Sequence, residues 1–190
     1  HTRLDGLNTL IVRADQIYNE FSSGTPDATA YRRFLKMLYD RAATPEAAPR
    51  YLLLFGDAAW DNRMLSGPWK QTKPEDFLLS YQSDDSFSHI TSFVMEDYFG
   101  LLDDGEGVSL KTEKVDLGIG RFPVSTEQEA KLLVDKTINY MENKEAGAWK
   151  NKIVILGDDG DDNLHMKSAE AVAKDIEKAY PEYDLQRIYW

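Results

Sequence analysis

Short, continuous apolar runs are the feature that most restricts the fold of this chain. Residues 10–12, 51–55 and 153–156 are uninterrupted apolar runs, and each is followed by glycine or a charged residue. Runs of this kind are typical of parallel strands that are covered on both faces. Two further stretches, 115–122 and 185–189, fit extended strands. The chain is therefore expected to build a sheet.

Helical patterns lie between these runs. Apolar side chains recur at helical spacing over 31–38, 130–141 and 169–176, as in helices that bury one face. Alternating strands and helices predict the α/β class, with an open, mostly parallel sheet flanked by helices on both faces. The length of 190 residues fits one domain or one large lobe of a bigger one.

The start of the 130–141 helix offers two capping schemes. Ser125 with Gln128, or Thr126 with Glu129, can form a capping box, in which each side chain binds the backbone N–H of the other residue. The sequence leaves both schemes open.

Charge and composition exclude several classes of function. Lysine and arginine number 22 against 33 aspartate and glutamate residues, giving a net charge of −11 and a pI of about 4.7. Nucleic acid and anionic lipid need a cationic surface, so neither is expected as the main partner. The sequence has no apolar run long enough to span a membrane and no signal-peptide pattern at its start. Cysteine is absent, which removes disulfides and a cysteine nucleophile from these residues.

Acidic residues are concentrated in two segments. Residues 75–116 carry 11 acids and two lysines, and four aspartates fall between 158 and 162. Neighbouring carboxylates repel one another unless a cation neutralises them or they point into water. Calcium takes oxygen ligands without a fixed spacing, so a Ca²⁺ site is expected in the first segment, with a solvated acidic surface as the alternative. The candidate ligands are Asp84, Asp85, Glu96 and Asp97.

Glycine-containing turns accompany three predicted strands, at Gly56-Asp57, Gly118-Ile119-Gly120 and 157–160. Ligands of open α/β sheets bind beyond the carboxyl ends of strands, so these turns are expected to share one site edge, although Gly and Asp also favour ordinary turns. The second turn does not fit a dinucleotide-binding loop, because Pro123 stands where the third glycine is needed. It fits better a strand in which small residues allow close packing.

The aspartate-rich turn at 158–162 has a second catalytic interpretation. Asp158 and Asp159 follow an apolar strand, as do the paired aspartates of Mg²⁺-dependent phosphoryl-transfer hydrolases, but the small hydroxylic residue expected after them is missing. His165 lies beside this turn and His89 in a polar loop, and neither accompanies the G-x-S-x-G signature of a serine triad. A phosphohydrolase is therefore a remote alternative.

Five motifs, taken together, are more specific than any single turn. They are Tyr51-Leu-Leu-Leu-Phe-Gly-Asp57, Tyr81-Gln-Ser83, Glu96-Asp-Tyr-Phe-Gly-Leu-Leu-Asp-Asp104, Asp116-Leu-Gly-Ile-Gly-Arg-Phe-Pro-Val124 and Lys136-Thr-Ile-Asn-Tyr140. In order and spacing, the chain from about residue 10 onward resembles the gingipain-type cysteine peptidases. Within that family it is most similar to the sortases of type IX secretion systems.

The resemblance implies a fold and an activity. Members of the family pair two α/β subdomains in a caspase-like arrangement, and the catalytic His-Cys dyad lies in the second. Residues 1–190 would then be the N-terminal subdomain, with the catalytic second subdomain absent and the fragment inactive by itself, in agreement with the absence of cysteine. The parent would be a cysteine-type endopeptidase that cleaves the C-terminal sorting domains of secreted proteins.

The resemblance also implies site residues and partners. Asp159 corresponds by position to an acid that orients the catalytic histidine, and Asp162 falls near the acid that receives the basic substrate side chain, for which a carboxylate is the natural partner. Family members bind Ca²⁺. The parent would be exported to the outer-membrane surface, with the downstream catalytic subdomain, protein substrates and secretion-system components as partners. A non-catalytic scaffold or partner-binding lobe of a secretion complex is the alternative.

Overall fold

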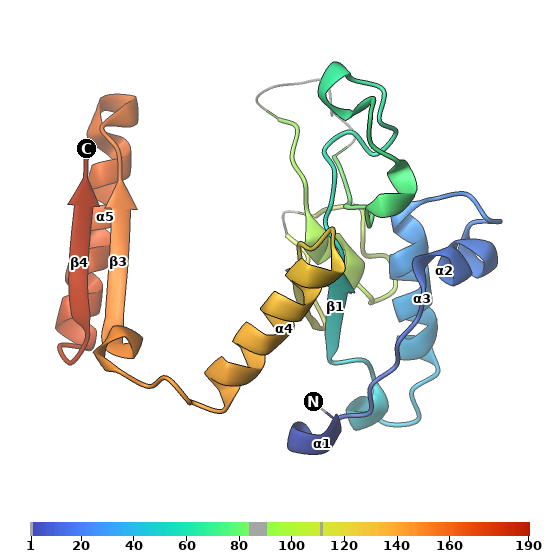
Figure 1. Cartoon of the computed structure of the whole chain (residues 1–190), viewed down its shortest axis with the longest axis horizontal. Coiled ribbons are helices and arrows are strands. Elements are labelled where there is room, and N and C mark those ends of the chain that lie inside the picture. Colours follow the sequence, from blue (N-terminus) through green and yellow to red (C-terminus); the bar gives the residue numbers. More distant parts are fainter. Residues whose placement is uncertain (1, 84–90, 111) are drawn as a thin grey trace. The chain divides into compact units, whose positions relative to one another are not determined.

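The chain folds into two compact units. The computed structural model describes residues 2–83, 91–110 and 112–190, leaving out the side chains of residues 3 and 4. The first unit extends to Leu133 and the second runs from Val134 to Trp190. The described helices and strands (Figure 1) are α1 Thr2–Asp5, α2 Ala14–Phe21, α3 Ala28–Asp40, β1 Tyr51–Phe55, β2 Gly118–Phe122, α4 Glu127–Met141, β3 Lys152–Gly157, α5 Gly160–Ala179 and β4 Asp184–Tyr189, with short 3₁₀ turns η1 Pro45–Ala47, η2 Gly67–Trp69, η3 Pro74–Asp76, η4 Glu96–Gly100 and η5 Ala148–Asn151.

Helix α3 supplies one side of the core of the first unit. Asp27 caps its start, because its carboxylate accepts a hydrogen bond of 2.8 Å from the Thr29 backbone N–H. Tyr31 and Leu35, one turn apart, are buried in the same cluster as Leu54 of β1. The spacing that predicted this helix is therefore the spacing of its buried face.

Strands β1 and β2 pair in parallel, with Tyr51 opposite Gly118 and Phe55 opposite Phe122. A Cβ atom on Gly118 would lie only 3.0 Å from the Tyr51 ring, so this glycine permits close packing as predicted. Gly118 stands at the start of β2, however, and so lies at the opposite end of the sheet from Gly56. The expectation that these two turns line one edge is wrong, because the register places them a full strand apart.

Aromatic side chains fill the rest of this core. Tyr98 and Phe99 of η4 are buried, and Tyr81 stacks on Tyr98 with ring centroids 3.9 Å apart. The Tyr18 hydroxyl of α2 is hydrogen-bonded to the Tyr31 hydroxyl. Burial raises the pKa of both phenols, since it disfavours the charged phenolate. The Tyr18–Tyr31 hydrogen bond joins α2 to α3, and the packing of Tyr31 against Phe99 joins α3 to η4.

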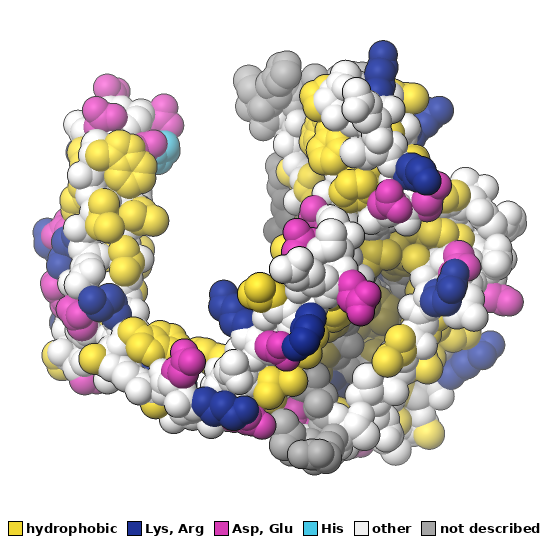
Figure 2. All heavy atoms as spheres, viewed as in Figure 1, with side chains coloured by type: hydrophobic (Ala, Val, Ile, Leu, Met, Phe, Trp, Pro, Cys, Tyr) yellow, Lys and Arg dark blue, Asp and Glu magenta, His cyan; other side chains and the backbone are white. Residues whose placement is uncertain are grey.

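The second unit is a two-stranded parallel sheet with one helix on one face. Lys152 of β3 pairs with Asp184 of β4, and the pairing continues to the ends of both strands. Ile153 and Ile155 are half-buried toward α5, whereas Val154 and Leu156 alternate with them and are exposed. Figure 2 shows hydrophobic side chains in yellow along this uncovered face.

The α/β class is confirmed, and four of the five predicted strands form. They lie in two two-stranded parallel sheets, β1-β2 and β3-β4. The predicted strand at 10–12 is wrong: residues 6–13 carry no regular structure, and Leu10 and Ile11 are exposed. An apolar run becomes a strand only when another backbone pairs with it.

At the start of α4 the structure selects one of the two capping schemes. The Glu129 backbone N–H donates to the Thr126 hydroxyl, and the Thr126 backbone N–H donates to the Glu129 carboxylate at 3.0 Å. Among the described residues, no helix is long and apolar enough to cross a membrane.

Candidate functional site

The acidic loop, residues 158–163, runs from the end of β3 through the non-helical first residues of α5 and carries the predicted catalytic and substrate-binding residues. It begins at Asp158, directly after the carboxyl end of β3, and β4 ends beside it, since the Trp190 backbone N–H donates to the Gly157 carbonyl at 3.2 Å. Gly157 allows α5 to pack closely on the strand: a Cβ on it would lie 3.3 Å from both Ala169 and the Met166 backbone. The loop thus stands where ligands of parallel sheets bind.

Asp159 and Asp162 are exposed on this loop. The Asp159 side chain makes no capping hydrogen bond with α5. The Asp162 backbone carbonyl accepts a hydrogen bond of 3.1 Å from the Lys167 ammonium group, which leaves its carboxylate out of that contact. Both carboxylates are therefore placed where an incoming cationic group can reach them.

His165 bridges two other aspartates of the loop. Its Nδ1 atom lies 2.5 Å from Asp158 Oδ1, and its Nε2 atom lies 3.4 Å from Asp161 Oδ2. These carboxylates raise the pKa of His165, chiefly through the hydrogen bond to Asp158, and the same bond lowers the pKa of Asp158. The sequence placed His165 beside the acidic turn but did not predict this bridge.

The loop backbone is unusual. Asp161, Asp162 and Asn163 are consecutive residues with φ of 52°, 55° and 63°, in the left-handed region. Asp and Asn tolerate this region better than most residues, because their short polar side chains bond locally. The turn folds the chain back so that a histidine seven residues after Asp158 can reach it.

The predicted calcium ligands are only partly within the described residues. Asp84 and Asp85 lie outside them. Glu96, on η4, accepts hydrogen bonds from Arg121 Nη2 with both carboxylate oxygens, at 2.8 and 3.0 Å, and Asp97 beside it is exposed. In residues 2–83, 91–110 and 112–190, no three acidic or histidine side chains gather as a metal site. The part of the set that the structure describes does not by itself make a Ca²⁺ cage.

Arg121 is a key residue that the sequence reasoning missed. From the β2 strand its guanidinium also donates to the Gly56 carbonyl at 2.9 Å and to the Leu79 carbonyl at 3.1 Å. It therefore joins the end of β1, the segment before Tyr81 and η4. A lone arginine inside an otherwise apolar and glycine-rich strand was the available signal.

Two other acids of the 75–116 segment, Glu113 and Asp104, have partners within the chain. The Glu113 carboxylate accepts backbone N–H bonds from Gly107 and Ser109 at 2.7 and 2.9 Å, and these bonds lower its pKa. Lys36 of α3 pairs with Asp104 at 2.8 Å.

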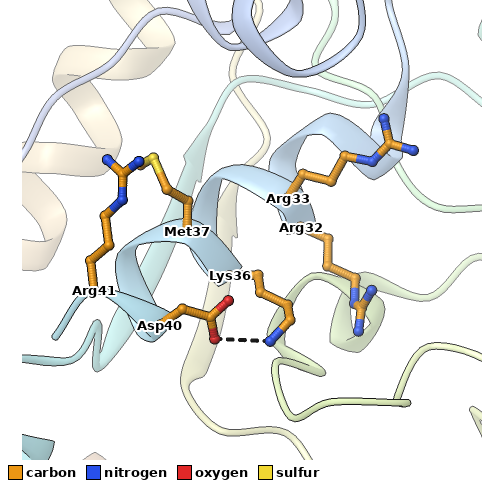
Figure 3. A pocket seen from close by; sticks show the side chains of 6 residues that line it. All are labelled: Arg32, Arg33, Lys36, Met37, Asp40 and Arg41. Carbon is orange, nitrogen blue, oxygen red and sulfur yellow. Dashed lines mark hydrogen bonds and ion pairs between the residues drawn. The ribbon is translucent and has the colours of Figure 1, made fainter.

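Helix α3 also lines an open basic concavity, which Figure 3 shows from close by. Lys36 reaches toward Asp40 across it, at 2.9 Å. Arg32 donates to the Leu101 and Glu106 carbonyls, so these cations already serve the fold.

Comparisons with known proteins identify the family of the chain. The profile of peptidase family C25 matches residues 1–190. The crystal structure of dimeric latent PorU from Porphyromonas gingivalis aligns with a TM-score of 0.66 and 45% sequence identity, covering 78% of this chain and 14% of that one. No match to a curated protein reaches significance. The motifs and the α/β fold of the chain, together with the family match over residues 1–190, show that the chain belongs to peptidase family C25, the gingipain family.

Proposed function

We propose that this chain is the N-terminal α/β subdomain of a gingipain-like cysteine endopeptidase that acts as a type IX secretion sortase. The observation that carries the proposal is the 45% identity to PorU over 78% of the chain. The chain spans only 14% of the PorU chain, so we propose, on the basis of this similarity, the activity, substrates and partners of the whole protein. The substrates are secreted proteins whose C-terminal sorting domains are removed at the cell surface.

The loop after β3 gives the proposal its chemistry. Asp159 orients the catalytic histidine of the downstream subdomain and stabilises it when it becomes an imidazolium. Asp162 receives a basic side chain of the substrate, for which a carboxylate offers a charge-assisted hydrogen bond. The 190 residues contain no cysteine, so the nucleophile comes from the downstream subdomain. Components of the secretion system are further partners of the whole protein.

The test uses a protein that includes the downstream subdomain. Asp159→Ala should lower kcat/KM for a peptide substrate, by about a hundredfold if the carboxylate positions the general base. Asp175→Ala, an exposed aspartate farther along α5, is the matched control and should leave kinetics unchanged. Equal kinetics of Asp159→Ala and the parent would remove Asp159 from the mechanism.

The 190-residue chain alone should cleave no peptide. Thiol-dependent turnover by the pure chain would contradict a downstream nucleophile. A non-catalytic scaffold is the second candidate, favoured if the downstream sequence lacks its His and Cys loops. Phosphatase activity with Mg²⁺ that disappears in Asp158→Asn would instead support the phosphohydrolase interpretation; the Asp158 carboxylate is, however, engaged by His165.

A further inference from the structure

The loop that carries Asp159 and Asp162 holds a conformation that its own backbone does not favour. Three successive residues, Asp161 to Asn163, lie in the left-handed region. Such a run persists only where surrounding contacts determine it. His165 and Lys167, from the regular part of α5, contact this loop through their side chains.

His165 makes the stronger set of contacts. Its two ring nitrogens reach carboxylates on either side of Gly160, Asp158 at 2.5 Å and Asp161 at 3.4 Å. Gly160 fits against the ring: a Cβ there would lie 3.3 Å from both His165 Nδ1 and Asp158 Oδ1. The imidazole therefore spans the turn from its first aspartate to the first left-handed residue.

We propose that His165 is a positioning residue, which fixes the loop so that Asp159 and Asp162 present their carboxylates to the catalytic histidine and to the substrate. The inference rests on the proposed function. His165 does not touch the reacting atoms; it acts through Asp158 and Asp161. Its side chain is 51% exposed, so its removal takes little apolar surface from the core of the unit.

The experiment compares three variants in the protein that includes the downstream subdomain. His165→Ala removes both contacts. His165→Asn keeps a donor near the position of Nδ1 and so keeps the bond to Asp158, while His165→Gln keeps a donor near the position of Nε2. The Asp175→Ala variant serves again as the control.

His165→Ala should lower kcat/KM for a peptide with arginine at the cleaved bond by about tenfold, mainly through a higher KM, because small displacements of positioning groups are costly. The same peptide with norleucine should lose less. His165→Asn should recover most of the loss, and the melting temperature should stay within about 2 °C of the parent. Unchanged kinetics of His165→Ala, or an equal loss in all three variants accompanied by a fall in melting temperature, would overturn the proposal.

A measurement on the 190-residue chain separates this inference from the proposed function. The intraresidue HN–Hα nuclear Overhauser effect is strong only at positive φ. It should be strong at Asp161, Asp162 and Asn163, weaken in His165→Ala and return in His165→Asn. If the parent cleaves no peptide but these signals respond as expected, the sortase assignment fails while the positioning of the loop stands. If these signals are equally strong in the unsubstituted chain and in His165→Ala, the positioning role of His165 is wrong.

Discussion

Arg121 links three segments of the first unit. It is only 13% exposed and binds Glu96 as well as the Gly56 and Leu79 carbonyls. Partners from three segments mean that removing the guanidinium leaves a carboxylate and the Gly56, Leu78 and Leu79 carbonyls without this donor. Such losses cost more than the net value of the bonds.

Arg121→Met should therefore lower the free energy of unfolding by about 2–4 kcal/mol in urea denaturation. The matched control is Arg41→Met at the exposed end of α3, which should change it by less than about 0.5 kcal/mol. Similar midpoints for both variants would show that the carbonyls find other donors.

The His165–Asp158 pair makes a second prediction at this scale, on pH. The pKa of His165 is raised, mainly by its hydrogen bond to Asp158, so the charged imidazole stabilises the fold below its ordinary pKa of about 6.5. This contribution is lost as pH rises through the raised pKa. The lowered pKa of Asp158 adds a contribution that is lost as pH falls through that lowered value.

An NMR titration of the His165 ring should thus give a midpoint above the ordinary value. In Asp158→Asn the midpoint should move back down, because the main cause of the shift is gone. A parent midpoint at or below that of Asp158→Asn would show that the two side chains do not pair in solution.

At the scale of elements, the capping box of α4 offers a direct comparison. Thr126 and Glu129 bond to one another's backbone N–H groups, while the Ser125 backbone N–H donates to the same Glu129 carboxylate at 2.8 Å. Thr126→Ala should destabilise the protein by about 1 kcal/mol, measured by chemical denaturation. Ser125→Ala keeps its backbone donor and should cost clearly less; the reverse order would favour the other scheme.

The elements that the sequence predicted share a physical origin. The strands predicted at 51–55 and 153–156 follow from continuous apolar runs and the helix predicted over 31–38 follows from apolar periodicity; both signals are local and require no knowledge of distant residues. The run at 10–12 has the same composition but lacks a paired backbone. Its structure depends on a neighbour, and a single sequence does not specify neighbours.

The candidate site could be predicted only in part for the same reason. The density of aspartates after an apolar strand located the loop at 158–162. The hydrogen bond between His165 and Asp158 depends on a left-handed backbone. The hydrogen bonds of Arg121 depend on three segments that meet in space. Neither set of contacts produces a periodic pattern in the sequence.

At the scale of the whole molecule, the calcium prediction awaits a binding measurement. Ca²⁺ bound by Asp84, Asp85, Glu96 and Asp97 would stabilise the folded chain and raise its melting temperature, because a ligand that binds only the native state shifts the equilibrium toward it. Millimolar Ca²⁺ should raise the melting temperature more than equal Mg²⁺, and Asp97→Asn should reduce the rise. No shift would leave Arg121, Lys36 and backbone N–H groups as the counter-charges of the segment.

The bare apolar faces of the two sheets bear on how the purified chain behaves. Tyr51, Leu53 and Phe55 on β1, like Val154 and Leu156 on β3, are exposed. Exposed apolar surfaces of this kind promote association, and repulsion between molecules of like charge opposes it. The net charge of this chain is −11 at neutral pH. Acidification toward the isoelectric point of about 4.7 should make solutions turbid, with concentrated salt promoting clouding at milder acidity. Light scattering against pH would record this, and Leu156→Glu, which removes an exposed apolar side chain and adds negative charge, should move the onset to lower pH.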